Sequence, residues 1–328
     1  MSAPATFLRR TVDADLSIRR VKAGRGFRYI GGNDKAIKDK ATLSRIASLG
    51  LPPAYRDVLI CADEHGHLQA TGYDARGRKQ YRYHPEWTAL RARQKYDDLT
   101  GFAAALPALR SRVDRHLRGG AMDKNYACAA MARLLDRTAM RLGDEAYSRE
   151  NGSFGATTLK TKHVTFKDGR IAFDYRAKGG KRVRRALSDK RLHRILERID
   201  DLKGERLFQY IGDDGQIYAL QNHHVNDYLG DDFSAKTFRT WRGTVAAFAR
   251  AMENEDKLTI KSLCEAAAKQ LHNTPTICRN SYIHPAVIDL SELETEARQK
   301  RLGEFINEQV TGLRKSEAQC LAYLNAQA

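Results

Sequence analysis

The chain has 328 residues, 42% of them hydrophobic, and 57 Lys and Arg against 40 Asp and Glu give it a net charge of +17. That length allows two domains, and so large a basic excess is typical of proteins that bind a polyanion, most often nucleic acid. No apolar run is long enough to span a membrane, the N-terminus lacks an apolar signal core, and the five scattered cysteines form no CxxC pair, which argues against a disulfide framework or a zinc ribbon.

The first part of the chain mixes strand patterns with turn signals. Strands are predicted over GRGFRYIGG and VLICADEHGHLQATGYDARGRKQYRYH, and a helix that ends at Gly50 is predicted over AIKDKATLSRIASLG. After Pro85 the pattern becomes helical. We therefore predict a strand-rich N-terminal domain over residues 1–88 and a larger, mainly α-helical domain over residues 89–328.

The second domain opens with long helical patterns. Two helices are predicted over WTALRARQKYDDLTGFAAAL and LPALRSRVDRHLRGG, the first ending at Pro107, and a third over KNYACAAMARLLDRTAMRLG. On the third helix Arg133, Arg137 and Arg141 recur at four-residue steps and so share a face, which we expect to be solvated. Later helices are predicted over DKRLHRILERID, SAKTFRTWRGTVAAFARAMEN, LTIKSLCEAAAKQL, LETEARQKRLGEFINEQV and KSEAQCLAYLNA.

One stretch interrupts the helices. In HVTFKDGRIAFDYRAKGGKRVRRAL apolar and polar residues alternate around Asp168-Gly169, a strong hairpin signal, and a second turn follows at Lys178-Gly179-Gly180. This pattern predicts a small three-stranded sheet with Lys178 at its far tip. The predicted fold class is therefore α+β.

The sequence lacks the motifs of several classes of enzyme and metal site. The chain has no phosphate-binding loop, no dinucleotide fingerprint, no HExxH and no Cys/His zinc spacing. The pairs Asp213-Asp214 and Asp231-Asp232 stand beside glycines, so turns are favoured over a Mg²⁺ site. His223-His224 is interpreted as the entry to a helix. We expect that neither ATP nor a metal is required, with Mg²⁺ acting at most as a stimulant.

A short segment near the C-terminus, HNTPTICRNSYIHP, places Tyr282 among polar residues between two prolines. A tyrosine is most often packing material. To attack a phosphodiester, a phenol of pKa about 10 needs a positive environment, and the transition state needs guanidinium groups on the phosphate oxygens. A lysine or arginine can protonate the leaving oxygen. Such chemistry calls for two arginines, a lysine, an Asn or His, and a tyrosine.

Five ordered segments carry such a set, and with them the sequence resembles type IB DNA topoisomerases of the small, poxvirus-like bacterial class. The segments are MRLGDEAYSRENGSFGATTLKTKHV, DYRAKGGKR, AKTFRTWRGT with its KxxR pattern, HNTPTICRNSYIHP, and GYDARGRKQYRYH near the N-terminus. The resemblance implies that Tyr282 is the nucleophile and Lys178 the general acid. It implies that the phosphate is held by Arg141, Arg239 and Asn273, and that DNA is touched by Gln80, Tyr81 and Tyr83.

Two positions depart from the family pattern. Ala177 precedes the lysine where many relatives have Gly, and Asn273 stands where viral members have His. An amide can donate to a phosphate oxygen but cannot shuttle a proton, so Asn273 is expected to stabilise charge. Further DNA contacts are predicted at basic residues near these motifs, and Arg242 is the nearest competitor of Arg239 for the catalytic role. These contacts are Arg76, Lys79, Lys236, Arg242 and Arg279.

The resemblance implies a cytoplasmic, nucleoid-associated monomer that closes as a clamp on duplex DNA and relaxes supercoils without ATP. It also implies a mainly helical catalytic domain of the kind that tyrosine recombinases share. Two alternatives stay open. A tyrosine recombinase uses a related catalytic set, although it usually has HxxR where this chain has Lys236 through Arg239. A non-catalytic architectural DNA-binding protein would need only the net charge of +17.

Overall fold

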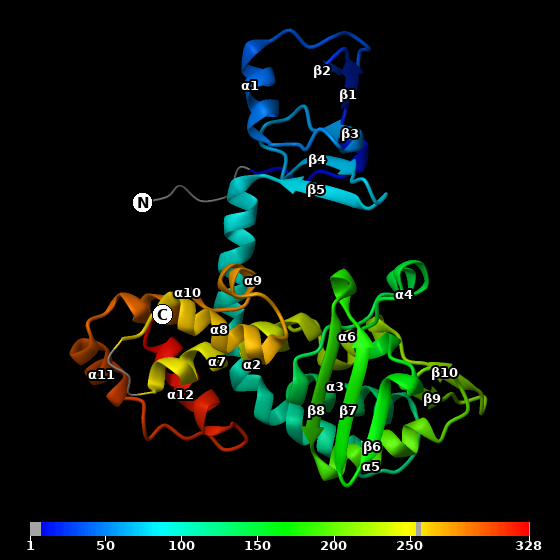
Figure 1. Cartoon of the computed structure of the whole chain (residues 1–328), viewed down its shortest axis with the longest axis vertical. Helices are drawn as coiled ribbons and strands as arrows, with labels where there is room; N and C mark the ends of the chain where they lie inside the picture. Colours follow the sequence, from blue (N-terminus) through cyan, green and yellow to red (C-terminus); the bar gives the residue numbers. More distant parts are fainter. Residues whose placement is uncertain (1–7, 254–256, 328) are drawn as a thin grey trace. The chain divides into compact units, whose positions relative to one another are not determined.

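The computed structural model describes residues 8–253 and 257–327, except for the side chains of residues 92–94. The chain forms two compact units, Met1–Asp97 and Asp98–Ala328, whose elements are labelled in Figure 1. Helix α2, Pro85–His116, leads from the first unit into the second and contains residues 88 and 89, where the sequence predicts a domain boundary. The fold is α+β, as predicted.

The first unit is built on an antiparallel sheet with the strand order β2-β1-β3-β4-β5. Strands β2 to β5 and helix α1 fall where the sequence predicts strands and a helix, whereas β1 is absent from the prediction. Strand β5 forms one edge of the sheet. The elements are β1 (Ile18–Ala23), β2 (Gly26–Ile30), α1 (Lys40–Ser48), β3 (Arg56–Ile60), β4 (Leu68–Tyr73) and β5 (Lys79–Tyr83).

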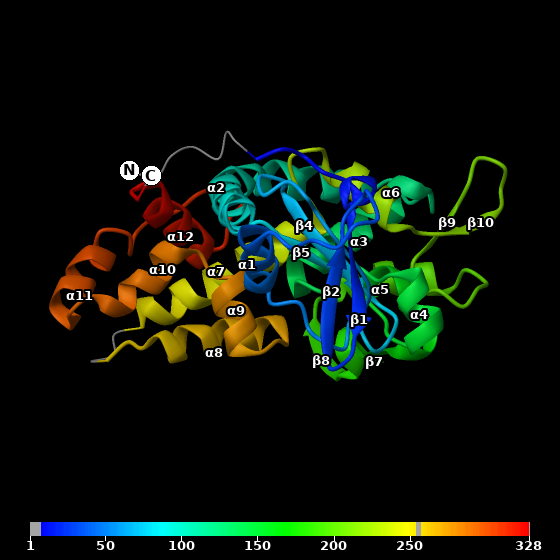
Figure 2. The same cartoon turned by 90° about the horizontal axis from the view of Figure 1, so that it is seen from above.

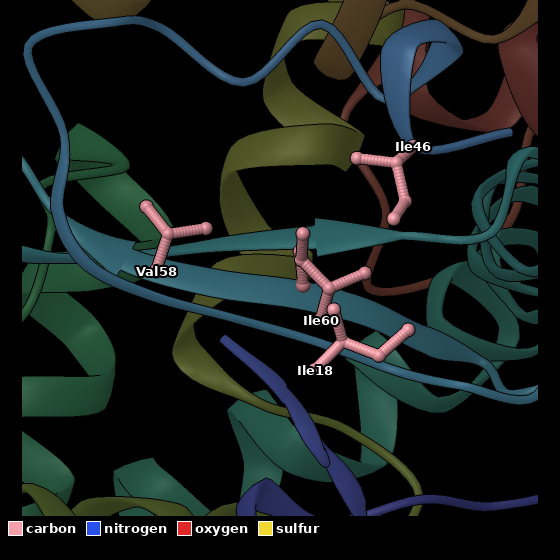
Figure 3. Packing of buried hydrophobic residues seen from close by; sticks show 5 residues of the cluster. Ile18, Ile46, Val58 and Ile60 are labelled. Carbon is pink, nitrogen blue, oxygen red and sulfur yellow. The ribbon is translucent and has the colours of Figure 1, made fainter. Parts of the chain in front are cut away.

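The core of the first unit lies between this sheet and α1. Val58 and Ile60 are two residues apart on β3 and therefore point to the same face, where they pack with Ile18, Ala70 and, from the helix, Ile46. Figure 3 shows Ile46 pointing from α1 toward Ile60 and Ile18. A second, smaller core cluster of this unit contains Leu16, Cys61 and Leu68, with Leu59 of β3 packed against it.

The second unit combines helices with two small sheets. In Figures 1 and 2 helices α7, α8, α10, α11 and α12 gather on one side of this unit, and the β6-β7-β8 sheet with α5 lies on the other. The helices after α2 are α3 (Lys124–Thr138), α4 (Glu145–Asn151), α5 (Lys190–Asp200), α6 (Asn222–Leu229), α7 (Ala235–Met252), α8 (Ile260–Leu271), α9 (Pro275–Ser281), α10 (Pro285–Asp289), α11 (Thr295–Gly303) and α12 (Lys315–Asn325). The strands are β6 (Val164–Lys167), β7 (Arg170–Arg176), β8 (Arg182–Ser188), β9 (Gln209–Ile211) and β10 (Ile217–Ala219).

Helix α2 passes through Pro107 without ending, so the prediction of two helices that meet there is wrong. A proline removes one helical hydrogen bond and crowds the preceding turn, which usually ends or kinks a helix. Here Leu99, Phe102 and Leu106 before the proline and Val113 after it are all buried. The burial of apolar side chains on both sides of Pro107 holds the helix together across it.

The predicted three-stranded sheet is confirmed, with the order β6-β7-β8. Asp168 and Gly169 have φ values of 50° and 73°, the left-handed pair that a tight hairpin turn requires. At the other end of β7, Lys178 begins a turn in which Gly179 and Gly180 also have positive φ values, 79° and 76°. Lys178 therefore lies at the hairpin tip, as predicted, and its side chain is exposed.

Helix α3 ends earlier than predicted, at Thr138, because Ala139 adopts the left-handed conformation with φ 50° and ψ 35°. Arg141 therefore lies beyond the helix and does not share a face with Arg133 and Arg137. Both of those arginines are half-buried and lie 3.4 Å from the Asp189 carboxylate. The predicted solvated stripe of three arginines is wrong, since two are paired and the third is placed by a separate loop.

The C-terminal helix α12 is joined to the helical side of the unit by a network of ion pairs. Arg110 of α2 lies 2.8 Å from Asp136 of α3 and 2.9 Å from Glu317 of α12. Arg314 lies 2.8 Å from the same aspartate and 2.6 Å from the same glutamate. Each buried carboxylate thus faces two guanidinium groups, which offsets the cost of burying the charges.

The five cysteines are buried free thiols. Among the helices that the structure describes, none combines the length and the apolar character that crossing a membrane requires.

Candidate active site

Tyr282 is delivered by the short helix α9. Thr274 caps the helix by accepting a hydrogen bond from the Ile277 N–H at 3.3 Å, and Pro275 occupies the first turn, as predicted. The Tyr282 N–H donates to the Cys278 carbonyl at 2.9 Å, so the tyrosine directly follows the last helical turn. Its side chain is buried, with 8% of the residue exposed.

Helix α7 packs against the backbone of Tyr282. The Thr244 hydroxyl donates to the Tyr282 carbonyl at 3.3 Å and accepts from the His284 N–H at 3.1 Å. At Gly243 a Cβ atom would lie only 2.5 Å from the Tyr282 carbonyl oxygen. The absence of a side chain at Gly243 therefore allows the tyrosine segment to approach α7 closely.

Replacing Gly243 by Ala is expected to lower the stability of the protein by about 1–3 kcal/mol, because the added methyl overlaps the backbone of Tyr282. A displacement of the phenol by about 1 Å would slow its reaction about 10²-fold. Thermal unfolding and the rate of the reaction at Tyr282 measure the two effects. Gly101→Ala is the matched control, since a Cβ there meets nothing within 4 Å and should stabilise α2 by roughly 0.5–1 kcal/mol. Equal behaviour of the two variants would contradict this account.

Arg239 on α7 is the central cation of the site, with only 3% of the residue exposed. Its guanidinium group donates to the Ala139 carbonyl, just after α3, and to the Leu271 carbonyl, at the end of α8, the latter at 3.3 Å. The guanidinium carbon lies 4.9 Å from the centre of the Tyr282 ring. Its Nε atom has no hydrogen-bond partner among the described residues. Arg239 thus ties three segments together and keeps one buried donor for another ligand.

The environment of Tyr282 lowers its pKa below the usual value of 10. Burial acts in the opposite direction and raises the pKa. The charges of Arg239 and Arg141, together with the hydrogen bonds that they contribute, outweigh that effect. The two arginines named from the sequence as catalytic are the ones that favour the phenolate.

Arg141 comes from the loop that begins at Ala139. Its carbonyl accepts a hydrogen bond from the Ala156 N–H at 2.8 Å, which holds the loop against the segment that precedes β6. At Gly155 a Cβ would lie 2.5 Å from the Leu142 carbonyl oxygen, so this second segment lies directly on the loop. The half-buried Arg141 side chain is held close enough to Tyr282 to affect its titration.

Asn273 follows His272, which ends α8 in the left-handed conformation with φ 47°. The Asn273 Oδ1 atom accepts a hydrogen bond from the Thr274 N–H at 3.0 Å, and this contact orients the amide. The buried Nδ2 atom has no partner in the described part of the chain. A buried amide donor without a partner costs free energy, and it fits the prediction that Asn273 donates to a phosphate oxygen.

The hairpin that carries Lys178 reaches this cluster through Tyr175. Tyr175 of β7 is buried, and its pKa is raised by burial, against the opposing charges of Arg185, Arg239 and Arg141. Lys178 stands three residues further along, at the exposed tip. The part of β7 next to the hairpin tip therefore joins the cluster, whereas the role of Lys178 stays a prediction.

Tyr175 and Arg185 are not among the site residues predicted from the sequence. Both lie on the inward face of the β7–β8 hairpin, where Tyr175 pairs with Val183 and Arg185 pairs with Phe173. Strand alternation could have placed them there, because Arg185 is two residues from Val183 on the apolar face of β8. The sequence could therefore have identified Arg185 as an arginine at a strand position where the alternating pattern predicts an apolar residue.

The other predicted contacts on the second unit separate into two groups. Lys236 and Arg279 are exposed and stay predictions as DNA contacts. Arg242 is half-buried one turn after Arg239, and burial lowers its pKa, with Arg314 and Asp136 as its nearest charged influences after burial. The environment of Arg242 is thus shared with the ion-pair network of α12.

The predicted contacts on the first unit lie on or next to β5. Tyr81 and Tyr83 are 48% and 45% exposed, and their rings stack with centroids 6.2 Å apart. Gln80 donates to Asp74 at 3.2 Å, and Lys79 pairs with Asp13. Arg76 is exposed in the preceding turn. Two exposed stacked tyrosines at a sheet edge form an aromatic and basic surface, which suits bases and phosphates.

The acidic pairs do not assemble a metal site. The Asp214 side chain accepts hydrogen bonds from the Gln216 N–H at 3.0 Å and from the Tyr218 hydroxyl at 2.7 Å. These local hydrogen bonds stabilise a turn, as predicted. The predicted helix entry at His223-His224 is confirmed, since both residues lie in the first turn of α6. Among the described residues no group of three or more His, Cys, Asp or Glu could hold a metal ion.

Comparisons with known proteins agree with this geometry. Residues 84–309 match the family model of the catalytic core of eukaryotic DNA topoisomerase I, and residues 26–74 match that of the N-terminal domain of bacterial DNA topoisomerase IB. A protein named DNA topoisomerase 1B from Acanthamoeba polyphaga mimivirus is 28% identical over 298 residues, which cover 85% of this chain and 88% of the relative. The matched ranges contain every residue of the cluster around Tyr282.

Proposed function

The chain belongs to the type IB DNA topoisomerase family, and on that premise we propose that it relaxes supercoiled duplex DNA through a 3′-phosphotyrosyl intermediate. The observation that carries the proposal is the position of Tyr282, a buried phenol whose pKa is lowered by two arginines. A phenolate is the nucleophilic form of tyrosine. Tyr282 attacks the scissile phosphorus, and a bond from its oxygen to the 3′-phosphate replaces the bond to the 5′-oxygen.

Charge on the phosphate increases in the transition state, and the cluster offers donors for it. Among the described residues, the Nε of Arg239 and the Nδ2 of Asn273 are buried donors without a hydrogen-bond partner, and Arg141 adds a third, positively charged contact. Such preorganised donors stabilise developing charge without reorganisation. Asn273 acts only as a donor, because its amide does not titrate at neutral pH.

The leaving 5′-oxygen needs a proton, and Lys178 supplies it as general acid. The glycines after Lys178 adopt left-handed conformations, and this lets the lysine stand at the tip of a tight turn, from which it reaches into a DNA groove. After rotation of the nicked duplex, the 5′-hydroxyl returns its proton and attacks the phosphotyrosine. The original phosphodiester and the free Tyr282 are restored.

No external energy enters this cycle. The phosphotyrosyl bond replaces one phosphodiester by another, so ATP is not required, and supercoil strain drives the net relaxation. The charge on the phosphate is met by side chains, so a metal is not required either, and Mg²⁺ acts at most as a stimulant. These side chains come from a mainly helical domain of the kind that tyrosine recombinases use.

The protein acts as a monomer in the cytoplasm, associated with the nucleoid. The two units close as a clamp on the duplex, the first through Gln80, Tyr81 and Tyr83 with Arg76 and Lys79, and the second through Lys236 and Arg279. The family match argues against a recombinase, and a match to a catalytic core argues against a silent architectural protein.

Supercoiled plasmid incubated with the protein in EDTA, without ATP, is expected to relax. Gel electrophoresis of the topoisomers measures it, and bound phosphates make the rate fall steeply with salt. Retardation of the plasmid without relaxation would support a binding protein, and exchange only at paired sites would support a recombinase. Activity that appears only after Mg²⁺ is added would contradict the metal-free mechanism.

A further inference from the structure

Arg185 is a cation on an apolar face. On the β7–β8 ladder it pairs with Phe173, and the neighbouring inward positions are Tyr175 opposite Val183 and Ile171 opposite Leu187. Phe173, Tyr175 and Val183 are buried, and Arg185 itself is half-buried. It is the charged member of an inward face that is otherwise apolar or aromatic.

No carboxylate in the described part of the chain lies within ion-pair distance of Arg185. The contrast with the outward face of the same strand is direct, since Arg182 and Arg184 both pair with Asp174, at 2.7 and 3.2 Å. Burial lowers the pKa of Arg185 to about 10, and the nearby positive charges of Arg239 and Arg242 act in the same direction. The guanidinium is still charged at pH 7, so the fold holds it at a cost that no acidic partner offsets.

The neighbours of Arg185 place it relative to the reacting group. The charge of Arg185 opposes the burial that raises the pKa of Tyr175 and adds to the burial that lowers the pKa of His272. The charge of Arg239 in turn acts on Arg185, so the two guanidinium groups face the same part of the site. Because Arg239 is proposed to hold the scissile phosphate, a second guanidinium near it is suited to the next phosphate along the same strand.

We propose that Arg185 binds the DNA phosphate adjacent to the scissile one and so positions the strand in the active site. The inference rests on the proposed function of the Tyr282 site and adds a residue to it. Arg185 is a positioning residue here, because it holds the backbone on which the reaction takes place and does not touch the reacting atoms. The bound phosphate supplies the anion that the folded protein lacks at this position.

The test is duplex binding by Arg185→Met, measured as a function of salt in a Tyr282→Phe background so that no cleavage is needed. Loss of one phosphate contact should reduce the slope of log K against log salt by about 0.9, and binding at low salt should weaken about 10- to 100-fold. Arg184→Met is the matched control from the next position of β8. Its guanidinium faces outward and is paired with Asp174, so its slope should change much less.

Thermal unfolding without DNA separates positioning from structure. Removal of a buried cation that has no acidic partner should leave the melting temperature of Arg185→Met unchanged or raise it, and Arg185→Lys should recover part of the salt slope. An unchanged slope, an equal loss in Arg184→Met, or a fall in melting temperature would overturn the proposal. Because relaxation by the unmodified protein is measured separately, failure here is distinguishable from failure of the proposed function.

Discussion

Replacing Tyr282 by Phe is expected to abolish relaxation while the protein still folds and binds DNA. The substitution removes only the phenolic oxygen, so the ring that packs under the Arg239 guanidinium at 4.9 Å is kept. Loss of a nucleophile that acts with a preorganised site lowers the rate on the order of 10⁴- to 10⁶-fold. Plasmid relaxation and trapping of the protein–DNA adduct with denaturant measure the loss, and duplex retardation measures binding.

Tyr175→Phe is the sharp control for this prediction. Tyr175 is also buried, and the charges of Arg141 and Arg239 also act on its pKa. It is therefore the nearest alternative nucleophile. The difference is that burial raises the pKa of Tyr175, whereas the arginines prevail at Tyr282 and lower its pKa. Relaxation should therefore survive in Tyr175→Phe. Activity that persists in Tyr282→Phe and disappears in Tyr175→Phe would move the nucleophile to β7.

Arg239→Ala is expected to slow adduct formation about 10³-fold or more, because it removes both a phosphate donor and the main cation beside the phenol. Arg239→Lys keeps a charge, but its single ammonium cannot reproduce the planar fork that bonds Ala139 and Leu271 at once. We expect a loss of about 10²-fold for the lysine variant. Single-turnover formation of the adduct measures both rates.

The pH dependence of the Arg239→Ala deficit follows from the sign of the Tyr282 shift. In the unmodified protein the cations hold the pKa of the phenol below 10, so the phenolate fraction increases through a lower pH range than for free tyrosine. Removal of the cation moves that range upward. The loss of rate in Arg239→Ala should therefore be larger at pH 7 than at pH 9. A loss of rate that does not change with pH would mean that Arg239 acts only through its contact with the phosphate and not through the pKa of Tyr282.

Arg242→Ala tests whether the correct arginine of α7 has been assigned. Arg242 lies one turn beyond Arg239, but its charged surroundings belong to the network of Asp136, Glu317 and Arg314. Its loss should change stability more than chemistry, with adduct formation within about tenfold of the unmodified protein, a change of about 1.4 kcal/mol or less in the activation free energy. A larger loss of rate in Arg242→Ala than in Arg239→Ala would exchange the two assignments.

The parts of the fold that follow from local chemistry could be predicted. Tight turns are strongly indicated by Asp168-Gly169 and by Lys178-Gly179-Gly180. Pro275 can start a helix because a proline in the first turn gives up no helical hydrogen bond. The end of α3 could not be predicted in this way. Ala139 adopts a left-handed conformation that usually selects Gly or Asn, and the contact that accompanies it, from Arg239 to the Ala139 carbonyl, comes from 100 residues away.

The site shows the same division between local and long-range information. Motif order identified Arg141, Arg239, Asn273 and Tyr282, and the structure brings Arg239 and Arg141 to the phenol. The tethers that hold them are backbone carbonyls, which leave no mark on residue type. Arg185 was overlooked because a basic residue in a basic segment is unremarkable, and only the strand register shows that it points inward.

The central claim is a covalent bond from Tyr282 to a 3′-phosphate, and a trapped adduct tests it most directly. The protein is reacted with a duplex labelled on the strand that retains the 3′-phosphate, denatured, and digested with trypsin and nuclease. Cleavage after Arg279 and Arg298 yields the peptide of residues 280–298, in which Tyr282 is the sole tyrosine. Mass spectrometry should find a nucleotide 3′-phosphate on this peptide. A nucleotide on another peptide, or attachment through a 5′-phosphate, would contradict the account.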